Sequence, residues 1–400
     1  MPKDILILYT KDTQELRNRR SALGSYIASL AKLLQKDGHR VRINDILFND
    51  LVSMGADVMS PAYSQSGLKA QVMKFVPKYL KQWVKDKMMI RRADEFIQLI
   101  QNQDPADIIL DFYTFGSRTG QALATKWNCP HYVVYDGPVL EEYAFFQGIE
   151  APMAKQAQAR QKDALSQANG VVVYSQAMAD YVQSLAELSD QRTLHLHQNV
   201  DFSRFEFCDE KPTPNPIEIG FIGSFLPWHR VDLLVAAFER LREAGHSVKL
   251  NLIGYGMKWE NIQQHVENSP FKADISMPGF KDKEELFQLK KQMHIGVVPS
   301  AIWYQAPNKL FEYGAMRIAC VAPPTPTISF LYEENVEITF FENNDLDSLY
   351  QALESLVTNP DHLMSMGKAI QSKIKEDYGP EKTLAFYQML LGLEREPANL

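Results

Sequence analysis

Residues 217–232 read IEIGFIGSFLPWHRVD and contain a strand, a glycine loop and the start of a helix in immediate succession. Residues 217–222 are apolar except for Glu218, which is typical of a largely buried strand. Gly223 follows it and lets the backbone approach a ligand closely. The loop then leads into a helix N-terminus, which favours anions. This order of elements is the repeating unit of a parallel α/β sheet.

The same unit repeats through the C-terminal half. Further strands are expected at 248–253, 275–277, 295–298, 318–321 and 338–341, with helices between them, notably at 230–244 and 283–292. The N-terminal half shows a similar alternation. Its strands are expected at 5–9, 41–43, 107–110, 131–135 and 171–174, with a first helix at 24–35. Two tandem series of this kind predict two doubly wound domains.

The segment 211–216, KPTPNP, interrupts the alternation. Three prolines in six residues cannot lie inside a helix or a central strand. We therefore expect the interdomain linker here. The predicted fold is α/β, with two Rossmann-like domains facing a central cleft that is lined by the carboxyl ends of their strands.

Bulk properties limit the function. The 400 residues carry a net charge of −7 and three cysteines without paired spacing. This balance argues against general nucleic-acid binding and against a disulfide framework or zinc site. A strand predicted from residue 5 leaves no room for a signal peptide, and no apolar run is long enough to span a bilayer. A cytoplasmic location is expected.

Residues 69–92 stand apart, with eight basic residues and one acidic residue among aromatic and apolar side chains. They fall in an expected helical insertion at about 55–95. Such a helix can lie on an anionic membrane surface, here the inner face of the membrane. The alternative is a helix that packs on its own domain and exposes its lysines to solvent.

Several glycine or proline loops follow the C-terminal strands in order, and they end at 307–315, PNKLFEYGA. Pro307 suits a first helical turn, and Lys309 adds a positive charge beside free N–H groups. Glu312 lies three residues later on the same face. A lysine for a diphosphate and a carboxylate for ribose hydroxyls fit a nucleotide diphosphate. The alternative is a surface ion pair between Lys309 and Glu312.

These motifs, G-S-F-L-P-W-H-R-V-D, G-Y-G, P-G-F, V-P-S and P-N-K-L-F-E-Y-G-A, cover most of residues 217–358. In this order they resemble retaining glycosyltransferases of family 4, which have the GT-B fold, and especially the branch with a Trp-His loop and a Lys-Leu-Phe-Glu-Tyr signature. The resemblance implies that a nucleotide diphosphate sugar binds in the C-terminal domain, with Lys309 on the diphosphate and Glu312 on the ribose.

The donor-binding residues implied in this way are Gly223, Ser224, His229, Arg230, Gly254, Tyr255, Gly256, Gly279, Phe280, Ser300, Asn308, Lys309, Leu310 and Glu312. Many members of the family carry an Arg and a Lys where this chain has Ser224 and His229, and a second Glu where it has Tyr304. The positive partners of the diphosphate are therefore expected to be Arg230 and Lys309. His229 is a further candidate, and its alternative is a structural residue at the helix start.

The N-terminal half resembles the family more weakly. Gly24 matches part of its glycine loop, and Asp136 ends a strand that is expected to face the cleft. Asp136 could position a sugar hydroxyl or accept a proton, or it could simply form an Asp-Gly turn. The expected acceptor side is Gly24, Asp136 and Glu141, and the expected catalytic residues are Asp136, Lys309 and Arg230. No metal site is expected, because His195 and His197 lack ligand partners.

The predicted activity is the transfer of a sugar from a nucleotide diphosphate sugar to a glycan, glycolipid or small molecule, with retention of configuration and without a required cofactor. The expected domains are residues 1–210 for the acceptor, 217–375 for the nucleotide-sugar and a helix at 376–400 returning to the first domain. The alternatives are an inactive nucleotide-sugar-binding partner and a GT-B nucleotide-sugar 2-epimerase. Polysaccharide biosynthesis is the expected setting.

Overall fold

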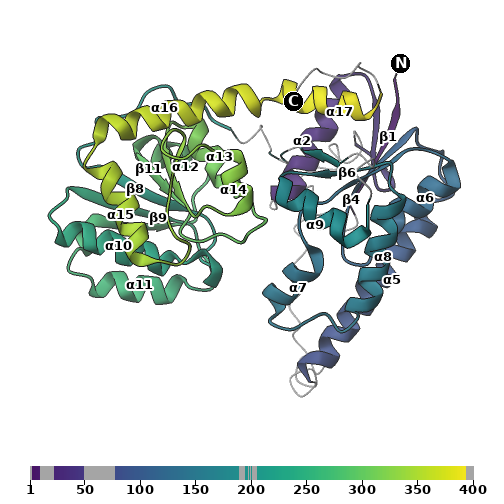
Figure 1. Ribbon diagram of the computed structural model, residues 1–400, viewed down its shortest axis with the longest axis horizontal. Helices are drawn as coiled ribbons and strands as arrows, with labels where there is room; N and C mark the ends of the chain where they lie inside the picture. The colour runs from purple at the N-terminus through teal and green to yellow at the C-terminus, as the bar shows by residue number, and fades with distance from the viewer. Residues whose placement is uncertain are drawn as a thin grey trace. The chain divides into compact units, whose positions relative to one another are not determined.

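A computed structural model describes residues 2–9, 22–48, 77–188, 194–196, 198, 200 and 205–392. The chain divides into two compact units (Figure 1). Unit 1 comprises residues 1–201 and 380–400, and unit 2 comprises residues 202–379.

Unit 1 is built on a parallel sheet with the strand order β3-β2-β1-β4-β5-β6-β7 among the described residues, and only β3 is antiparallel to its neighbour. Its strands are β1 (Asp4–Leu8), β2 (Arg40–Ile43), β3 (Ile46–Leu47), β4 (Ile108–Phe112), β5 (His131–Val134), β6 (Gly170–Val173) and β7 (Leu194–Leu196). Its helices are α2 (Ala22–Lys36), α5 (Lys78–Ile100), α6 (Thr119–Trp127), α7 (Val139–Gln147), α8 (Ala154–Gln167), α9 (Gln176–Ala186) and α17 (Pro380–Leu390).

The apolar run 5–8 of β1 follows from its place inside two helix layers. Ile5 and Ile7 contribute to a core with α2, β2, β4 and α17. Leu6 and Leu8 point to the opposite face, toward residues of α5 and α6. A strand covered on both faces needs apolar side chains at every position, which is why β1 does not alternate between polar and apolar residues.

Unit 2 has an all-parallel sheet with the order β10-β9-β8-β11-β12-β13 among the described residues. Its strands are β8 (Ile217–Ile222), β9 (Val248–Ile253), β10 (Ile275–Gly279), β11 (Ile295–Val297), β12 (Ala319–Ala322) and β13 (Ile338–Phe340). Its α-helices are α10 (Val231–Glu243), α11 (Trp259–Asn268), α12 (Lys283–Gln292), α13 (Asn308–Ala315), α14 (Pro326–Leu331), α15 (Leu346–Val357) and α16 (Pro360–Asp377). The order reverses between β8 and β11, which makes that point the topological switch of the sheet.

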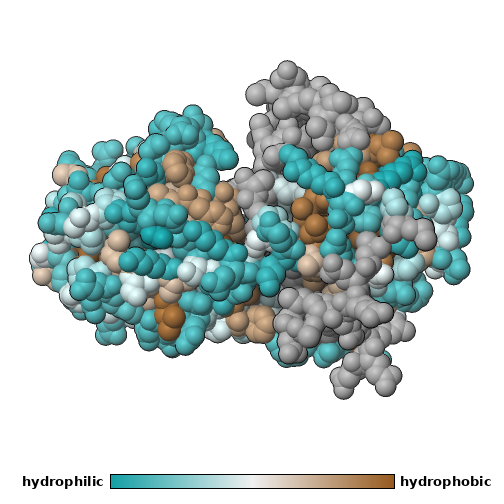
Figure 2. Space-filling model, turned by 90° about the horizontal axis from the view of Figure 1, so that it is seen from above, coloured by the Kyte–Doolittle hydropathy of each residue, from teal (hydrophilic) through white to brown (hydrophobic). Residues whose placement is uncertain are grey.

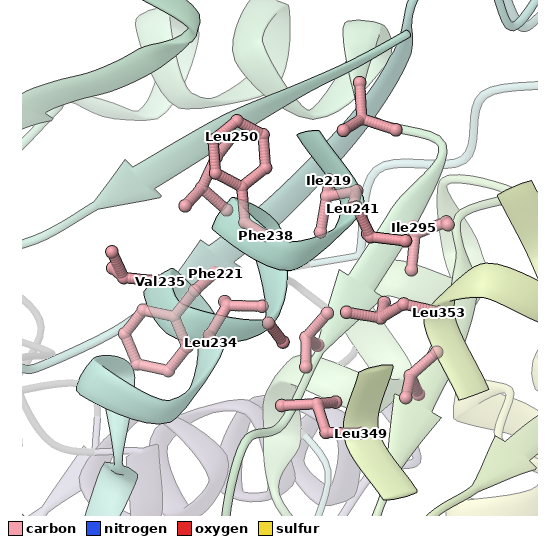
Figure 3. Close-up of a cluster of buried hydrophobic side chains, with 14 of the residues drawn as sticks. Ile219, Phe221, Leu234, Val235, Phe238, Leu241, Leu250, Ile295, Leu349 and Leu353 are labelled. Carbon is pink, nitrogen blue, oxygen red and sulfur yellow. The ribbon is translucent and has the colours of Figure 1, made fainter. Parts of the chain in front are cut away.

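One face of the unit 2 sheet carries the core shown in Figure 3. Phe238 and Leu241 of α10 pack with Leu250 of β9, Ile295 of β11 and Leu353 of α15, and all five side chains are fully buried. The surface contrasts with this core. Hydrophilic residues cover most of the face of unit 2 visible in Figure 2, with smaller apolar patches between them. The core holds β8, and therefore the switch point, in a fixed position.

The sequence predictions of two doubly wound α/β series are confirmed. Every expected strand in both halves is present within one or two residues, and the helix expected at 283–292 is α12. The short strand β3 was not predicted, because two residues carry too little periodicity. The basic insertion expected at 55–95 is described only from residue 77 onward, where it forms α5.

The proline segment 211–216 lies within unit 2, after the point at residue 202 where the chain enters that unit. The Lys211 ammonium donates hydrogen bonds to the carbonyls of Lys290 and Met293 at the end of α12, at 2.7 and 2.8 Å. It thereby adds side-chain hydrogen bonds at a helix end, where carbonyls lack the N–H partners of the next helical turn. The prolines exclude regular structure from this segment, and the lysine ties it to unit 2.

The C-terminal helix α17 belongs to unit 1, where it lies beside α2 (Figure 1). The hydroxyls of Tyr26 and Tyr387 are 3.0 Å apart and both side chains are buried. Burial and the neighbouring phenol raise the pKa of Tyr26 well above its ordinary value. This hydrogen bond ties the end of the described chain to its first helix.

We expect a double-mutant cycle on this pair to show coupling. Tyr26→Phe and Tyr387→Phe should each destabilise unit 1, and the double variant should be less destabilised than the sum by about 1 kcal/mol. Chemical denaturation of the four proteins measures this. Additive effects would show that the two hydroxyls do not interact, and Tyr332→Phe in unit 2 is the control that should add independently.

Candidate functional site

Three loops at the carboxyl edge of the unit 2 sheet lie against one another. The Gly223 N–H donates to the Ile253 carbonyl and the Gly254 N–H donates to the Gly279 carbonyl, both at 3.0 Å. The Phe225 N–H donates to the Tyr255 carbonyl at 3.2 Å. The loops after β8, β9 and β10 are therefore joined by backbone hydrogen bonds. The switch point of the sheet is at the first of them.

The glycines of the G-Y-G motif are required for this loop packing. A Cβ on Gly254 would lie 2.0 Å from the Gly223 carbonyl oxygen, and one on Gly256 would lie 2.6 Å from the Phe225 nitrogen. Gly254 also has a φ of +135°, where side chains other than glycine's are strained. Gly279 has a φ of +74° but open space around it. Close packing of the loops therefore requires the glycines of the G-Y-G motif, whether or not they also contact a ligand.

Lys309 extends from the first turn of α13 over the loop after β8. Its Nζ atom is 4.3 Å from the centroid of the Phe221 ring and would lie 3.1 Å from a Cβ on Gly223. Burial lowers its pKa to about 8, although the charge of Glu312 acts in the opposite direction. In the part of the chain that the structure describes, Lys309 Nζ forms no ion pair with a carboxylate. The expected alternative of a Lys309–Glu312 ion pair is therefore wrong.

The position of Lys309 is fixed by Tyr313, a residue that the sequence analysis quoted in the motif but did not assign to the site. The Tyr313 hydroxyl accepts a hydrogen bond from the Ile222 N–H at 2.9 Å. Its fully buried ring lies where a Cβ on Gly296 of β11 would clash at 2.4 Å. Tyr313 therefore attaches α13 to both strands of the switch point. Burial raises its pKa, so the phenol stays protonated.

His229 is a neutral side chain in this site. It lies in the short 3₁₀ helix η2 (Pro227–His229), and its Nδ1–H donates to the Ser224 carbonyl. Burial first, and then the charge of Lys309, lower its pKa to about 4. With the proton on Nδ1, the Nε2 atom is left as a hydrogen-bond acceptor. His229 therefore supplies no positive charge near neutral pH.

Arg230 has its own partners. Its guanidinium forms an ion pair with Asp232 at 3.1 Å and donates to the Asn344 side-chain oxygen at 2.9 Å. Its backbone has a φ of 47°, between η2 and α10. The expectation of Arg230 as a diphosphate-binding cation thus requires these contacts to be exchanged. Lys309 is the cation that reaches the Gly223 loop.

The remaining predicted donor residues fall into two groups. Ser224 is exposed, and Ser300, Asn308 and Glu312 are partly exposed at the same edge of the sheet. The Leu310 side chain is fully buried, so only its backbone could meet a ligand. Tyr304, which replaces the family's second glutamate, is also buried.

Two aromatic side chains from the predicted donor set stand out by their exposure. Phe280 is 85% exposed and Tyr255 is 61% exposed. Met257, two residues after Tyr255 and not among the predicted donor residues, is also mostly exposed. Large apolar side chains left in water at a sheet edge are suited to stack on a ring-shaped ligand.

In unit 1, Asp136 and the start of α2 lie close together. Asp136 is exposed at the end of β5, and its charge contributes to the raised pKa of Tyr26 on α2. Gly24 is buried inside α2, two residues before Tyr26, so it does not form the loop that the resemblance implied. Glu141 lies elsewhere, in the first turn of α7, where it helps burial to raise the pKa of Tyr181 on α9 to about 12.

No metal site is visible in the ranges described, where no group of three His, Cys, Asp or Glu side chains converges. The side chains of His195 and His197 lie outside the described residues. Within the same ranges, no helix combines the length and apolar composition needed to cross a bilayer.

Gly254→Ala and Gly279→Ala separate steric clash from backbone strain, because both positions have positive φ and only Gly254 is crowded. We expect Gly279→Ala to destabilise unit 2 by about 1–2 kcal/mol. Gly254→Ala should cost about 3 kcal/mol or more, since the loop after β8 must move. Thermal and chemical unfolding measure the difference. Equal costs would mean that the loops tolerate separation.

Lys309→Met should stabilise unit 2 by about 1–2 kcal/mol at pH 7, because the folded protein holds the ammonium at a cost. The unfolded chain binds the proton up to about pH 10.5 and the folded one up to about 8. The stability of the parent protein therefore rises between these values, and its deficit against Lys309→Met should shrink. Lys258→Met, at an exposed lysine in the next loop, is the control and should change little. A deficit that is constant with pH would contradict the assignment.

Several known proteins are similar to this chain. Residues 216–359 match the family described as Glycosyl transferases group 1. WcaL of Escherichia coli K12, a candidate colanic acid biosynthesis glycosyltransferase, is 22% identical over 188 residues, which are 46% of each chain. A poly(ribitol-phosphate) alpha-N-acetylglucosaminyltransferase of Staphylococcus aureus is 20% identical over 54% of this chain and 42% of its own. The match thus spans about half the length of these curated relatives.

Solved structures share the fold over almost the whole chain. A sucrose-phosphate synthase from Thermosynechococcus elongatus has a TM-score of 0.70 at 14% identity, covering 98% of this chain and 100% of its own. Anabaena HepE in complex with UDP has a TM-score of 0.66 at 12% identity, covering 98% and 99%. The predicted pair of Rossmann-like domains with the GT-B fold is confirmed. Residues 216–359, which match the glycosyl transferases group 1 model, make up most of unit 2.

Proposed function

We propose that the protein is a glycosyltransferase that moves a sugar from a nucleotide diphosphate sugar to an acceptor, with retention of anomeric configuration. The observation that carries this proposal is the Lys309 ammonium, which is partly desolvated, has no carboxylate partner among the described residues and lies over the Gly223 loop. A buried ammonium that has lost part of its hydration is suited to bind an anionic ligand, because the ligand restores favourable electrostatic contacts. The group 1 domain, the glycosyltransferase relatives and the family 4 resemblance all agree with it.

The donor is proposed to bind at the carboxyl edge of the unit 2 sheet. Lys309 and the free N–H groups at the start of α13 hold the diphosphate. Glu312, on the same face of α13, binds the ribose hydroxyls. The exposed rings of Tyr255 and Phe280 line the nucleotide and sugar. UDP, which HepE binds, is the first nucleotide to test.

His229 has a different role from the cation that many relatives carry. As a neutral imidazole with Nε2 free to accept, it is proposed to receive a hydrogen bond from a donor hydroxyl. Ser224 is close to it in the same loop and is exposed. The loop is therefore polar but uncharged, and Lys309 carries the main positive charge. Arg230 could add to it only by leaving Asp232.

The acceptor is proposed to bind on unit 1, with Asp136 orienting its hydroxyl and with Gly24 and Glu141 as further candidates. In the proposed step, the acceptor oxygen forms a bond to the anomeric carbon while the bond from that carbon to the diphosphate breaks. The acceptor proton passes to the leaving phosphate oxygen on the same face, which gives retention. Lys309 stabilises the charge that develops on the diphosphate.

The cellular setting is also a proposal. A glycan or lipid-linked acceptor fits relatives named for colanic acid biosynthesis and for poly(ribitol-phosphate). We propose a cytoplasmic protein that needs no resident cofactor and contacts the inner face of the membrane through residues 69–92.

The activity is tested by incubating the full chain with a panel of nucleotide diphosphate sugars and following release of the nucleotide diphosphate. Release that depends on added acceptor, with the α or β configuration preserved in the product by NMR, is the expected result. Tight nucleotide-sugar binding without turnover for any acceptor would favour an inactive binding partner. Conversion of the donor to its 2-epimer without acceptor would indicate an epimerase.

Lys309→Gln should reduce turnover by about 100-fold or more, because it removes charge stabilisation of the leaving group. Diphosphate binding favours the protonated lysine, so UDP affinity of the parent protein should fall as pH rises above about 8. This fall should be absent in Lys309→Gln and preserved in the control Lys258→Gln. Isothermal titration across pH 6.5–9.5 measures it. An identical pH dependence in Lys309→Gln would exclude Lys309 as the diphosphate contact.

A further inference from the structure

The first half of α5 buries two polar side chains and leaves its large apolar side chains exposed. Gln82 and Asp86 are buried. Tyr79, Leu80 and Trp83 are exposed, and so are Val84, Met88 and Met89. The second half has the usual arrangement, with Ile90, Ala93 and Ile100 buried. A surface helix normally turns its apolar stripe to the core, so the reversal at 78–89 needs a cause.

Internal hydrogen bonds fix this orientation. The Asp86 carboxylate accepts from the Tyr143 hydroxyl of α7 and, at 3.2 Å, from the Met153 N–H that precedes α8. Gln82 also bonds to the Tyr143 hydroxyl. Rotating α5 to bury its apolar side chains would break these contacts and leave polar groups unsatisfied. The apolar face is therefore held outward by the polar one.

The end of α7 extends the same surface. A Cβ on Gly148, which ends α7, would lie 3.6 Å from the Lys78 Nζ atom at the start of α5. Phe145 and Phe146, just before it, are 49% and 41% exposed. Figure 1 shows α7 running beside the lower part of α5. We call Tyr79, Leu80, Trp83, Val84, Met88, Phe145 and Phe146 together the α5–α7 surface.

Positive charge surrounds the α5 side chains of this surface, whereas the charged residues of α7 are Glu141 and Glu142. Residues 78–92 contain six basic residues and one acidic residue, Asp86, which is buried. Lys87 lies over the Trp83 ring, with Nζ 5.1 Å from its centroid. Lys81 and Lys85 are one helical turn apart, beside the row formed by Leu80, Val84 and Met88. The chain as a whole carries −7, so this basic surface is a local feature.

We propose that the α5–α7 surface docks on an anionic lipid bilayer, with its aromatic and aliphatic side chains at the headgroup boundary and its lysines on lipid phosphates. Charge complementarity selects this occupant. A second copy of the chain meeting the same surface would bring the two sets of lysines together. This surface supplies the residues and the orientation for the proposed membrane contact of 69–92, and it includes α7 as well. Membrane docking through it does not depend on transferase activity.

The test is flotation of the full chain with vesicles of phosphatidylcholine alone and of phosphatidylcholine mixed with phosphatidylglycerol. We expect binding to the mixed vesicles, little to the neutral ones, and weakening by salt. Phe145→Ser with Phe146→Ser, and separately Lys81→Glu with Lys85→Glu, should each reduce partitioning by about tenfold or more. The Trp83 fluorescence should shift to the blue on binding.

Matched controls lie on the same protein. Leu99→Ser removes an exposed apolar side chain from the far end of α5, and Lys272→Glu reverses an exposed charge in unit 2; both should bind as the parent does. Unchanged melting temperatures would show that the variants are folded. The proposal would be overturned if the parent protein did not bind the mixed vesicles, or if the Phe145/Phe146 variant bound them equally well. It would also be overturned if the parent protein self-associated without lipid and the Phe145/Phe146 variant did not, because the surface would then contact a second copy of the chain. Nucleotide release without vesicles reports separately on the transferase.

Discussion

The hydrogen bond from the Ile222 N–H to the Tyr313 hydroxyl is the contact on which the candidate site depends. It joins the last residue of β8 to the middle of α13, and the same ring fills the space that Gly296 of β11 leaves open. The helix is thereby held at the point where the strand order reverses. Lys309 is one turn before Tyr313 on that helix, so its ammonium is directed at the Gly223 loop. Without this attachment, the Lys309 ammonium could turn into solvent, away from the Phe221 ring and the Gly223 backbone. It would then lose the burial that lowers its pKa.

The fold was largely predictable because its signal is local. Buried parallel strands need apolar residues on both faces, and β1 shows this in the four consecutive apolar residues 5–8. What the sequence could not show is pairing at a distance. The proline segment 211–216 resembles a linker by composition, yet Lys211 caps carbonyls near residue 290, about eighty residues away. No window of sequence contains that contact, and the same is true of the Tyr26–Tyr387 hydrogen bond.

The sequence predicted which residue types lie at the site, but not whether each side chain is charged, paired or buried. The order of motifs brought Lys309, Gly223 and Gly254 to one edge of the sheet. Whether a charge is available there depends on neighbours in space. Arg230 and His229 are adjacent in sequence, but the arginine is paired with Asp232 while the histidine is neutral under the influence of burial and Lys309. Gly24 illustrates the converse: a glycine suggests a loop, but here it lies within α2, where helix packing outweighs its weak propensity.

Two features of this protein go against the rules that the rest of the chain follows, and both lie where binding is proposed. Lys309 is a partly desolvated cation without a carboxylate partner among the described residues, and the first half of α5 buries polar groups while exposing aromatic ones. Each lowers the stability of the unbound protein, through lost hydration in the first case and through apolar surface left in water in the second. A bound anion would compensate the lost hydration of Lys309, and a lipid headgroup boundary would cover the apolar side chains of α5. Because the two costs have different physical origins, they mark two separate surfaces, one in each unit of the fold.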